Sequence, residues 1–153
     1  MMDAQTLRNI IHRDLHLSLT VTGIYAVDTL PPALRPGQAL IANTDVWRGE
    51  GLHWVTVYRN TSGDYEFFDS LGKTPQHYDE RFRDFLHSDC SMYNAAPLQQ
   101  SDSNLCGAYV LYYLYHRSRG LKMSSILSHF STNCMLNDKI VKTFVDMMRI
   151  KSI

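Results

Sequence analysis

Cysteine is scarce in this chain, and its few thiols are not spaced for pairing. Three cysteines occur among 153 residues, an odd number, and Cys90, Cys106 and Cys134 lie far apart in the sequence. The first residues also lack the basic and apolar regions of a secretory signal peptide. Both features are atypical of secreted domains stabilised by disulfides, so we expect an intracellular protein with reduced thiols.

Long apolar runs, repeats and linkers are also missing. A membrane-spanning helix needs roughly 18 consecutive apolar residues, and the runs here are much shorter, so we expect no membrane partner. The only proline-rich stretch, residues 30–37, has the length of a short loop. With 44% hydrophobic residues, the chain can bury one good core but hardly two, so we expect a single domain over residues 1–153.

The chain has no net charge, but its charged residues are unevenly distributed. Residues 1–115 carry 8 Lys/Arg against 13 Asp/Glu, whereas residues 116–153 carry 7 against 2. The basic last third either contacts nucleic acid or an acidic partner, or forms a solvated helix face. Because the overall charge is zero, nucleic-acid binding through this part is expected to be weak and salt-sensitive.

Hydrophobic periodicity predicts an α+β domain. Its helices are expected near residues 3–16, 78–87 and 106–117, with one or two more toward the C-terminus. Its strands are expected near residues 38–43, 53–59, 65–69 and 91–95. Because strands are bracketed by helices, we expect a sheet packed against the helix over residues 106–117.

Three residues occur in local settings that suit a thiol protease. His53 opens an apolar strand, Asp69 closes the next strand, and Cys106 begins the long apolar helix. A cysteine, a histidine, an orienting carboxylate and an oxyanion donor make up the minimum set for nucleophilic acyl transfer. Each residue also has a structural interpretation, in which His53 is an ordinary strand residue, Asp69 forms a turn and Cys106 is a small buried hydrophobe.

The turn between the second and third predicted strands decides whether His53 and Asp69 can meet. A three-residue loop with Gly63 in the left-handed conformation pairs Asn60 with Asp64. His53 and Asp69 then become diagonal neighbours on one face of the sheet. A two-residue loop would place them on opposite faces, which would argue against a catalytic pair.

The sequence before Cys106 favours a reactive thiol. Ser103 and Asn104 are good N-cap residues, so the thiol is expected in the first turn of the helix, in the positive field of the helix dipole. This field and a protonated His53 would favour the thiolate form at neutral pH. Gln100 lies in a turn-rich stretch that could bring its amide beside the Cys106 backbone N–H, and two such donors form an oxyanion hole.

No metal site is predicted. His12 and His16 have the helical i, i+4 spacing of zinc proteases, but the general-base glutamate is missing. An exposed helix face is the simpler interpretation, and nothing in the sequence requires a cofactor.

Several spaced motifs resemble those of adenain-type cysteine proteases, a group that includes the adenovirus maturation protease and the SUMO-deconjugating enzymes. The motifs are Gly51-Leu52-His53-Trp54, Phe68-Asp69-Ser70-Leu71-Gly72, and Gln99-Gln100 followed by Asn104-Leu105-Cys106-Gly107. The first is similar to the adenovirus enzyme, whereas the second and the spacing from Gln100 to Cys106 are more similar to the SUMO proteases. The resemblance covers most of residues 7–118.

This resemblance implies a papain-like core, with a mixed sheet packed against a central helix that carries the nucleophile. It implies that Cys106 is the nucleophile, that His53 is base and acid, and that Asp69 orients His53. It places Gln100 in the oxyanion hole, with Gln99 as the second choice because only Gln100 has the family's spacing to the cysteine.

The same resemblance implies a narrow cleft that favours glycine in the substrate. Gly51, Trp54 and Gly107 would line this cleft, with Trp54 as its roof unless that side chain is plain core. Cys90 lies close to where the adenovirus enzyme keeps a cysteine that bonds an activating peptide, so it is either such a site or an ordinary strand-edge cysteine. DNA is a second cofactor that the resemblance implies, through the basic last third.

The leading hypothesis is a viral or virus-derived endopeptidase that cleaves capsid or virion precursor proteins at glycine-containing sites, in the host nucleus or the virion. A second is a peptidase that removes SUMO or ubiquitin-like modifiers, which also end in glycine. A third is a catalytically silent module that binds peptides or nucleic acid.

Overall fold

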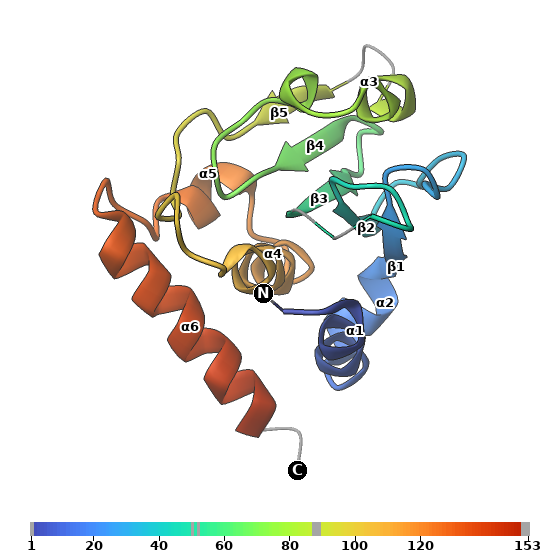
Figure 1. Ribbon diagram of the computed structural model, residues 1–153. Helices are drawn as coiled ribbons and strands as arrows, with labels where there is room; N and C mark the ends of the chain where they lie inside the picture. The colour runs from blue at the N-terminus through green and yellow to red at the C-terminus, as the bar shows by residue number, and fades with distance from the viewer. Residues whose placement is uncertain (1, 50, 52, 87–89, 151–153) are drawn as a thin grey trace.

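The computed structural model describes residues 2–49, 51, 53–86 and 90–150, and it shows an α+β arrangement around a five-stranded sheet (Figure 1). The strands lie in sequence order: β1 (Val21–Ala26), β2 (Ala39–Asn43), β3 (Trp54–Arg59), β4 (Tyr65–Phe68) and β5 (Cys90–Tyr93). The outer pairs β1/β2 and β4/β5 are parallel, whereas β3 is antiparallel to both its neighbours. The sheet is therefore mixed, and the predicted α+β class is confirmed.

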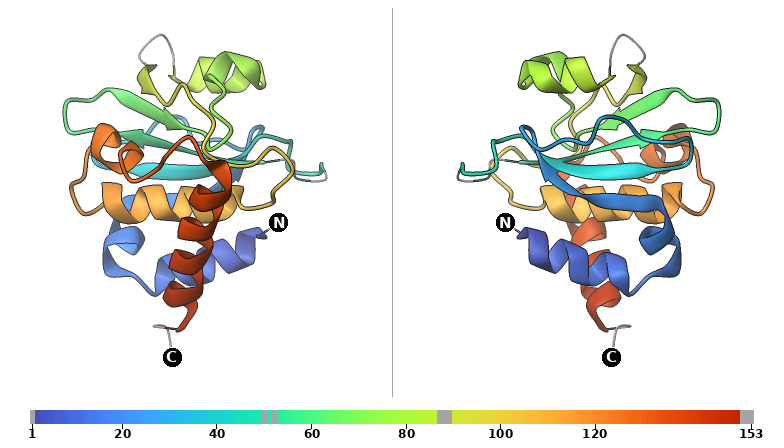
Figure 2. Two further views of the ribbon diagram at one scale, coloured as in Figure 1. Left: turned by 90° about the vertical axis from the view of Figure 1, so that its left-hand side faces the viewer. Right: turned by 90° about the vertical axis from the view of Figure 1, so that its right-hand side faces the viewer.

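Helices cover both faces of the sheet. They are α1 (Ala4–His12), α2 (Leu15–Thr20), α3 (Glu80–Leu86), α4 (Cys106–Arg117), α5 (Met123–Leu127) and α6 (Cys134–Ile150), with a short 3-10 helix η1 (Pro75–His77). Helix α4 lies against one face with α1 and α6 beyond it, and α3 covers the other face (Figures 1 and 2). No helix in the described ranges is long and apolar enough to cross a membrane.

Side-chain alternation along the strands divides the core into two layers. In β3, Trp54 and Tyr58 belong to the layer shared with α4, whereas Val55 and Val57 belong to the layer shared with α3. Helix α4 is buried from residue 106 to residue 114, because the sheet, α1 and α6 surround it. The helix that begins at Cys106 is thus central, and its first turn has a fixed position relative to the ends of the strands.

The predicted helix over residues 3–16 is in fact two helices. The carboxylate of Asp14 accepts a hydrogen bond from the Leu17 N–H at 3.0 Å and so caps a new helix, α2. The same carboxylate pairs with Arg119, which follows the end of α4, with an N···O distance of 2.5 Å. The break therefore follows from an N-cap residue that hydrophobic periodicity does not register.

Besides shifts of one residue at the ends of β2, β3 and β4, three larger differences from the sequence-based expectations occur. Strand β1 was not predicted, because it is a half-buried edge strand with Gly23 in its middle. The helix expected from residue 78 begins at Glu80, after η1. Strand β5 ends at Tyr93 instead of residue 95. All three lie at edges or element ends, where the periodic signal is weakest.

Candidate active site

The turn between β3 and β4 has the three-residue geometry, one of the two that the sequence leaves open. The Asn60 N–H donates to the Asp64 carbonyl at 2.9 Å, and Gly63 has a φ of 91°. Arg59 pairs with Tyr65 in the ladder. This register sets the start of β3 beside the end of β4, and it is the alternative that lets His53 and Asp69 lie on one face of the sheet.

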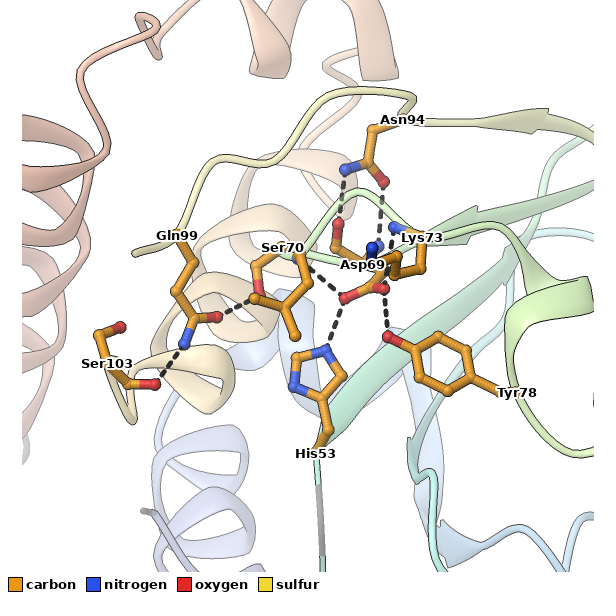
Figure 3. A network of polar contacts seen from close by, with 9 residues as sticks. His53, Asp69, Ser70, Lys73, Tyr78, Asn94, Gln99 and Ser103 are labelled. Carbon is orange, nitrogen blue, oxygen red and sulfur yellow. Dashed lines mark hydrogen bonds and ion pairs between the residues drawn. The ribbon is translucent and has the colours of Figure 1, made fainter. Parts of the chain in front are cut away.

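His53 and Asp69 meet at this end of the sheet (Figure 3). The His53 Nε2 and an Asp69 carboxylate oxygen are 2.5 Å apart, and the two residues are 7% and 0% exposed. Cys106 lies close enough to His53 to contribute to the raised pKa of this histidine. Because Nε2 is bonded to Asp69, Nδ1 is the ring nitrogen left for the thiol.

The carboxylate of Asp69 accepts hydrogen bonds from four groups. Besides His53, they are the N–H groups of Leu71 at 2.9 Å and Lys73 at 3.2 Å, and the hydroxyl of Tyr78 at 2.5 Å. Asp69 therefore forms a turn and orients His53 at the same time. The structural and the catalytic interpretation of Asp69, which the sequence leaves open, are therefore compatible with each other.

Burial and neighbouring charges act in opposite directions on the His53/Asp69 pair. Burial lowers the pKa of His53, but hydrogen bonds and charge from Asp69 and Cys106 outweigh it and raise the pKa to about 9. Burial raises the pKa of Asp69, but His53 and the Tyr78 hydroxyl hold it below its ordinary value. At neutral pH the pair is an imidazolium beside a carboxylate.

Tyr78 and Asn94 complete this network, and neither was predicted from the sequence. The ring of Tyr78 stacks on His53 with centroids 6.1 Å apart, and burial beside Asp69 raises the pKa of Tyr78, so its hydroxyl remains a donor. Asn94 accepts from the Asp69 N–H at 3.0 Å and donates to the Asp69 carbonyl at 2.5 Å. Both approach from segments distant in sequence, with no motif to signal the contact.

Cys106 is the first residue of α4 and is 2% exposed. The predicted caps Ser103 and Asn104 do not cap the helix, because the N-cap residue is Leu105, which makes no side-chain cap hydrogen bond. The first N–H groups of an α-helix have no intrahelical acceptor. Without a polar cap in the way, they can serve a negatively charged group that forms at the thiol.

The two adjacent glutamines point to different partners. The Gln100 amide donates to Asp138 of α6 at 3.1 Å. Gln99 accepts from the Ser70 hydroxyl at 2.6 Å and donates to the Ser103 carbonyl at 2.7 Å, and Figure 3 shows its amide beside the network of His53 and Asp69. The structure thus connects Gln99, the second choice from sequence spacing, to Ser70, the residue after Asp69, and directs the amide of Gln100 toward α6.

Trp54 packs against the first turn of α4. It is 5% exposed, and its indole N–H donates to the Met2 carbonyl at 2.8 Å. A Cβ at Gly107 would lie 3.4 Å from Trp54 Cδ1 and 3.2 Å from Met2 Cβ, so the glycine permits this close packing. In this conformation Trp54 is a core residue with one edge at the surface.

Two cavities flank these residues. The first, of about 140 Å³, is lined by Gly51 and Trp54 together with Trp47, which is 66% exposed. The second, of about 490 Å³, is lined by His53, Lys73 and others. Trp47 had no motif support in the sequence, and its place in the first cavity adds it to the candidate substrate-contacting residues.

Cys90 and the basic C-terminal residues are the remaining predicted sites. Cys90 begins β5, but its side chain lies outside the described residues, and so does any disulfide it forms. In the basic last third, Arg117 pairs with Glu66 and Arg119 pairs with Asp14. These two basic residues therefore serve the fold. Across the described part of the chain, no three His, Cys, Asp or Glu side chains group so as to hold a metal ion.

A thiol at a helix N-terminus, an imidazolium and a buried carboxylate together have the chemistry needed for acyl transfer. Neither a scan against protein-family models nor a search of curated proteins finds a match for this chain. Function is therefore inferred from the geometry of the site and from the motif resemblance.

Proposed function

We propose that this protein is a cysteine endopeptidase with a papain-like core, in which Cys106, His53 and Asp69 form the catalytic triad. The observation that carries this proposal is the buried pair of His53 and Asp69, joined through Nε2, with Cys106 at the start of α4 near enough to act on the pKa of His53. A structural interpretation accounts for each residue separately, but it gives no reason for the three to converge at the end of a sheet.

In the proposed reaction, the Cys106 thiolate attacks the carbonyl carbon of the scissile peptide bond and forms a tetrahedral oxyanion. His53 then gives its proton to the leaving amine as the C–N bond breaks, which leaves a thioester on Cys106. A water molecule attacks the thioester and gives a proton to His53. The acid product leaves, and the thiolate and imidazolium are regenerated.

The oxyanion would be stabilised by the Cys106 backbone N–H and by a glutamine amide. We propose Gln99 for this role in place of Gln100. Gln99 bonds Ser70, the residue after Asp69, and only one of its two amide N–H groups donates to Ser103, so the second remains for the substrate. The Gln100 amide is held by Asp138 on α6.

The proposed substrates are viral precursor proteins with glycine near the scissile bond. The support for this choice is the motif resemblance together with the tight packing of Trp54 on Gly107 next to the nucleophile. Removal of SUMO or ubiquitin-like modifiers remains the second candidate, because their tails also end in glycine. An activating peptide at Cys90 and stimulation by DNA are proposals from the resemblance alone.

Thiol labelling tests whether the protein is an enzyme at all. With iodoacetamide at neutral pH, we expect Cys106 to react at least tenfold faster than Cys134, and the His53→Gln variant to lose this excess. Peptide mass mapping reports each thiol separately. Equal rates at Cys106 and Cys134 would support the silent binding module instead.

A digest of proteome-derived peptides identifies the substrate class. Cuts made by the wild type and not by Cys106→Ala are expected to have glycine beside the scissile bond. Parallel incubation with SUMO and ubiquitin precursors separates the two enzyme candidates, because a deconjugating enzyme would process an intact modifier. The absence of any Cys106-dependent cut would remove the main proposal.

A further inference from the structure

Two adjacent polar residues of helix α6, Asn137 and Asp138, form hydrogen bonds with the segment that precedes Cys106. They are 0% and 6% exposed, which is unusual for an amide and a carboxylate. The sequence resemblance described above fades before this helix, so neither residue is among the motifs. Buried polar groups of this kind need partners, and here the partners lie next to the proposed oxyanion donor.

Asp138 receives one hydrogen bond from each of two elements. Its Oδ1 accepts from the Tyr109 hydroxyl of α4 at 2.7 Å, and its Oδ2 accepts from the Gln100 amide at 3.1 Å. The Tyr109 hydroxyl also lies 3.1 Å from the Leu98 carbonyl, which accepts from the Asn137 amide at the same distance. Leu98 and Gln100 are thereby both tied to α6.

These two tied residues flank Gln99 in the sequence. With its neighbours fixed to α6, Gln99 directs its own amide to the opposite partners, Ser70 and Ser103. The backbone is held there as well, because the Gln99 N–H donates to the Ser70 carbonyl at 3.1 Å. The contacts on both sides together fix the directions of the two glutamine side chains, with Gln99 toward Ser70 and Ser103 and Gln100 toward Asp138.

We infer that Asp138, with Tyr109, is a positioning residue for the oxyanion hole. It holds the Gln100 amide on α6 and fixes the segment so that Gln99 presents its free N–H to the substrate. This inference rests on the proposed peptidase function. It predicts that a change on α6 alters the stabilisation of the oxyanion without altering the nucleophilicity of Cys106.

Two reactions of the same thiol separate these effects. Alkylation by iodoacetamide consumes the thiolate and forms no oxyanion, whereas acylation by N-acetylglycine p-nitrophenyl ester passes through a tetrahedral oxyanion. The Cys106→Ala variant supplies the background for both. The ratio of the acylation rate to the alkylation rate then reports oxyanion stabilisation at Cys106, whatever the natural substrate is.

The variants Asp138→Ala, Asp138→Asn and Tyr109→Phe test the positioning role. Removing an oxyanion donor costs about 10²–10³ in rate, so a displaced donor should lower the ratio by about 10- to 100-fold in Asp138→Ala and less in the other two. Gln99→Ala should lower the ratio as well, and Gln100→Ala should change it little. Asp146→Asn is the matched control, because Asp146 lies on the same helix in an exposed pair with Lys142.

Each remaining outcome contradicts the inference in a recognisable way. A higher ratio in Asp138→Ala would mean that Asp138 sequesters the true donor, Gln100. An unchanged ratio, or equal losses in both reactions, would reduce Asp138 to a structural residue. Slow alkylation of wild-type Cys106 would instead remove the proposed function. If Asp138→Ala fails to fold, Tyr109→Phe decides, because it removes one hydroxyl and keeps the ring.

Discussion

Among single residues, Asp69 combines the most roles. Its carboxylate closes a turn through the Leu71 and Lys73 N–H groups, and it also accepts from His53 and Tyr78. A fully buried carboxylate needs this many donors to remain charged. The turn that seems to explain Asp69 by itself thus supplies half of the hydrogen bonds that let it orient His53.

The hydroxyl of Tyr78 is expected to matter to stability because it bonds a buried charge. Tyr78→Phe should lower the free energy of unfolding by about 1.5–3 kcal/mol, the range for hydrogen bonds to charged groups. Urea denaturation measures this change. Tyr115→Phe is the control, because the Tyr115 ring packs on Arg119 and Phe144. Equal losses in both variants would show that Asp69 does not depend on Tyr78.

The raised pKa of His53 gives a pH dependence of definite sign. The folded state holds the proton more tightly than the unfolded state, whose pKa is near 6.5. The stabilisation from His53 is therefore complete below about pH 6.5 and lost as the pH rises through about 9. Between these limits the wild type should lose about 1–3 kcal/mol more than His53→Gln in free energy of unfolding. If the free energy of unfolding changed with pH equally in the two proteins, the raised pKa of His53 would be contradicted.

Among the elements, the β3/β4 hairpin controls the site most directly. Its three-residue turn fixes the register, and a shift of one residue would move Asp69 to the other face of the sheet. Gly63 makes this turn possible with its φ of 91°. The turn at the opposite end of the hairpin therefore determines whether His53 can bond the carboxylate of Asp69.

Replacing Gly63 tests the conformational requirement of this turn. Gly63→Ala should cost about 1–2 kcal/mol in free energy of unfolding, because a Cβ is disfavoured in the left-handed region. Gly63→Asn should cost less, since asparagine tolerates that conformation better. Thermal denaturation compares the two. Equal costs would mean that the backbone conformation is not the reason for the glycine.

At the scale of the whole molecule, long-range ion pairs connect the sheet to the helices. Glu66 of β4 is 2% exposed and bonds Arg117 of α4 twice, with N···O distances of 3.0 Å for both contacts. Tyr113 donates to the same carboxylate at 3.1 Å. These contacts hold the end of α4 opposite to Cys106 and so fix the axis of the helix that carries the nucleophile.

Breaking this ion pair on one side should destabilise the fold strongly. Arg117→Met leaves the Glu66 carboxylate buried without a countercharge, which typically costs about 3–5 kcal/mol. The double variant Glu66→Gln with Arg117→Met should recover a large part of that loss. Denaturant unfolding measures both. The exposed pair of Lys142 and Asp146 is the control, and breaking it should cost less than about 1 kcal/mol.

The sequence by itself determined the α+β class, the position of the β3/β4 hairpin and the place of Cys106 at the start of the central helix. These features depend on local periodicity and turn chemistry, which neighbouring residues specify. The unpredicted break at Asp14 and the edge strand β1 mark the limit of that information. Periodicity carries no signal for a single capping residue or for a half-buried edge.

Only the tertiary structure decided which side chains complete the site. Tyr78 and Asn94 reach Asp69 from separate segments, and Asp138 on α6 engages Gln100, whereas Gln99 bonds Ser70 and Ser103. The spacing to Cys106 could not predict the different partners of the two glutamines, because neighbouring residues in an irregular segment differ only in the partners that the fold brings to them. Apart from Ser103, those partners lie between 9 and 38 residues away in the sequence, where contact depends on packing.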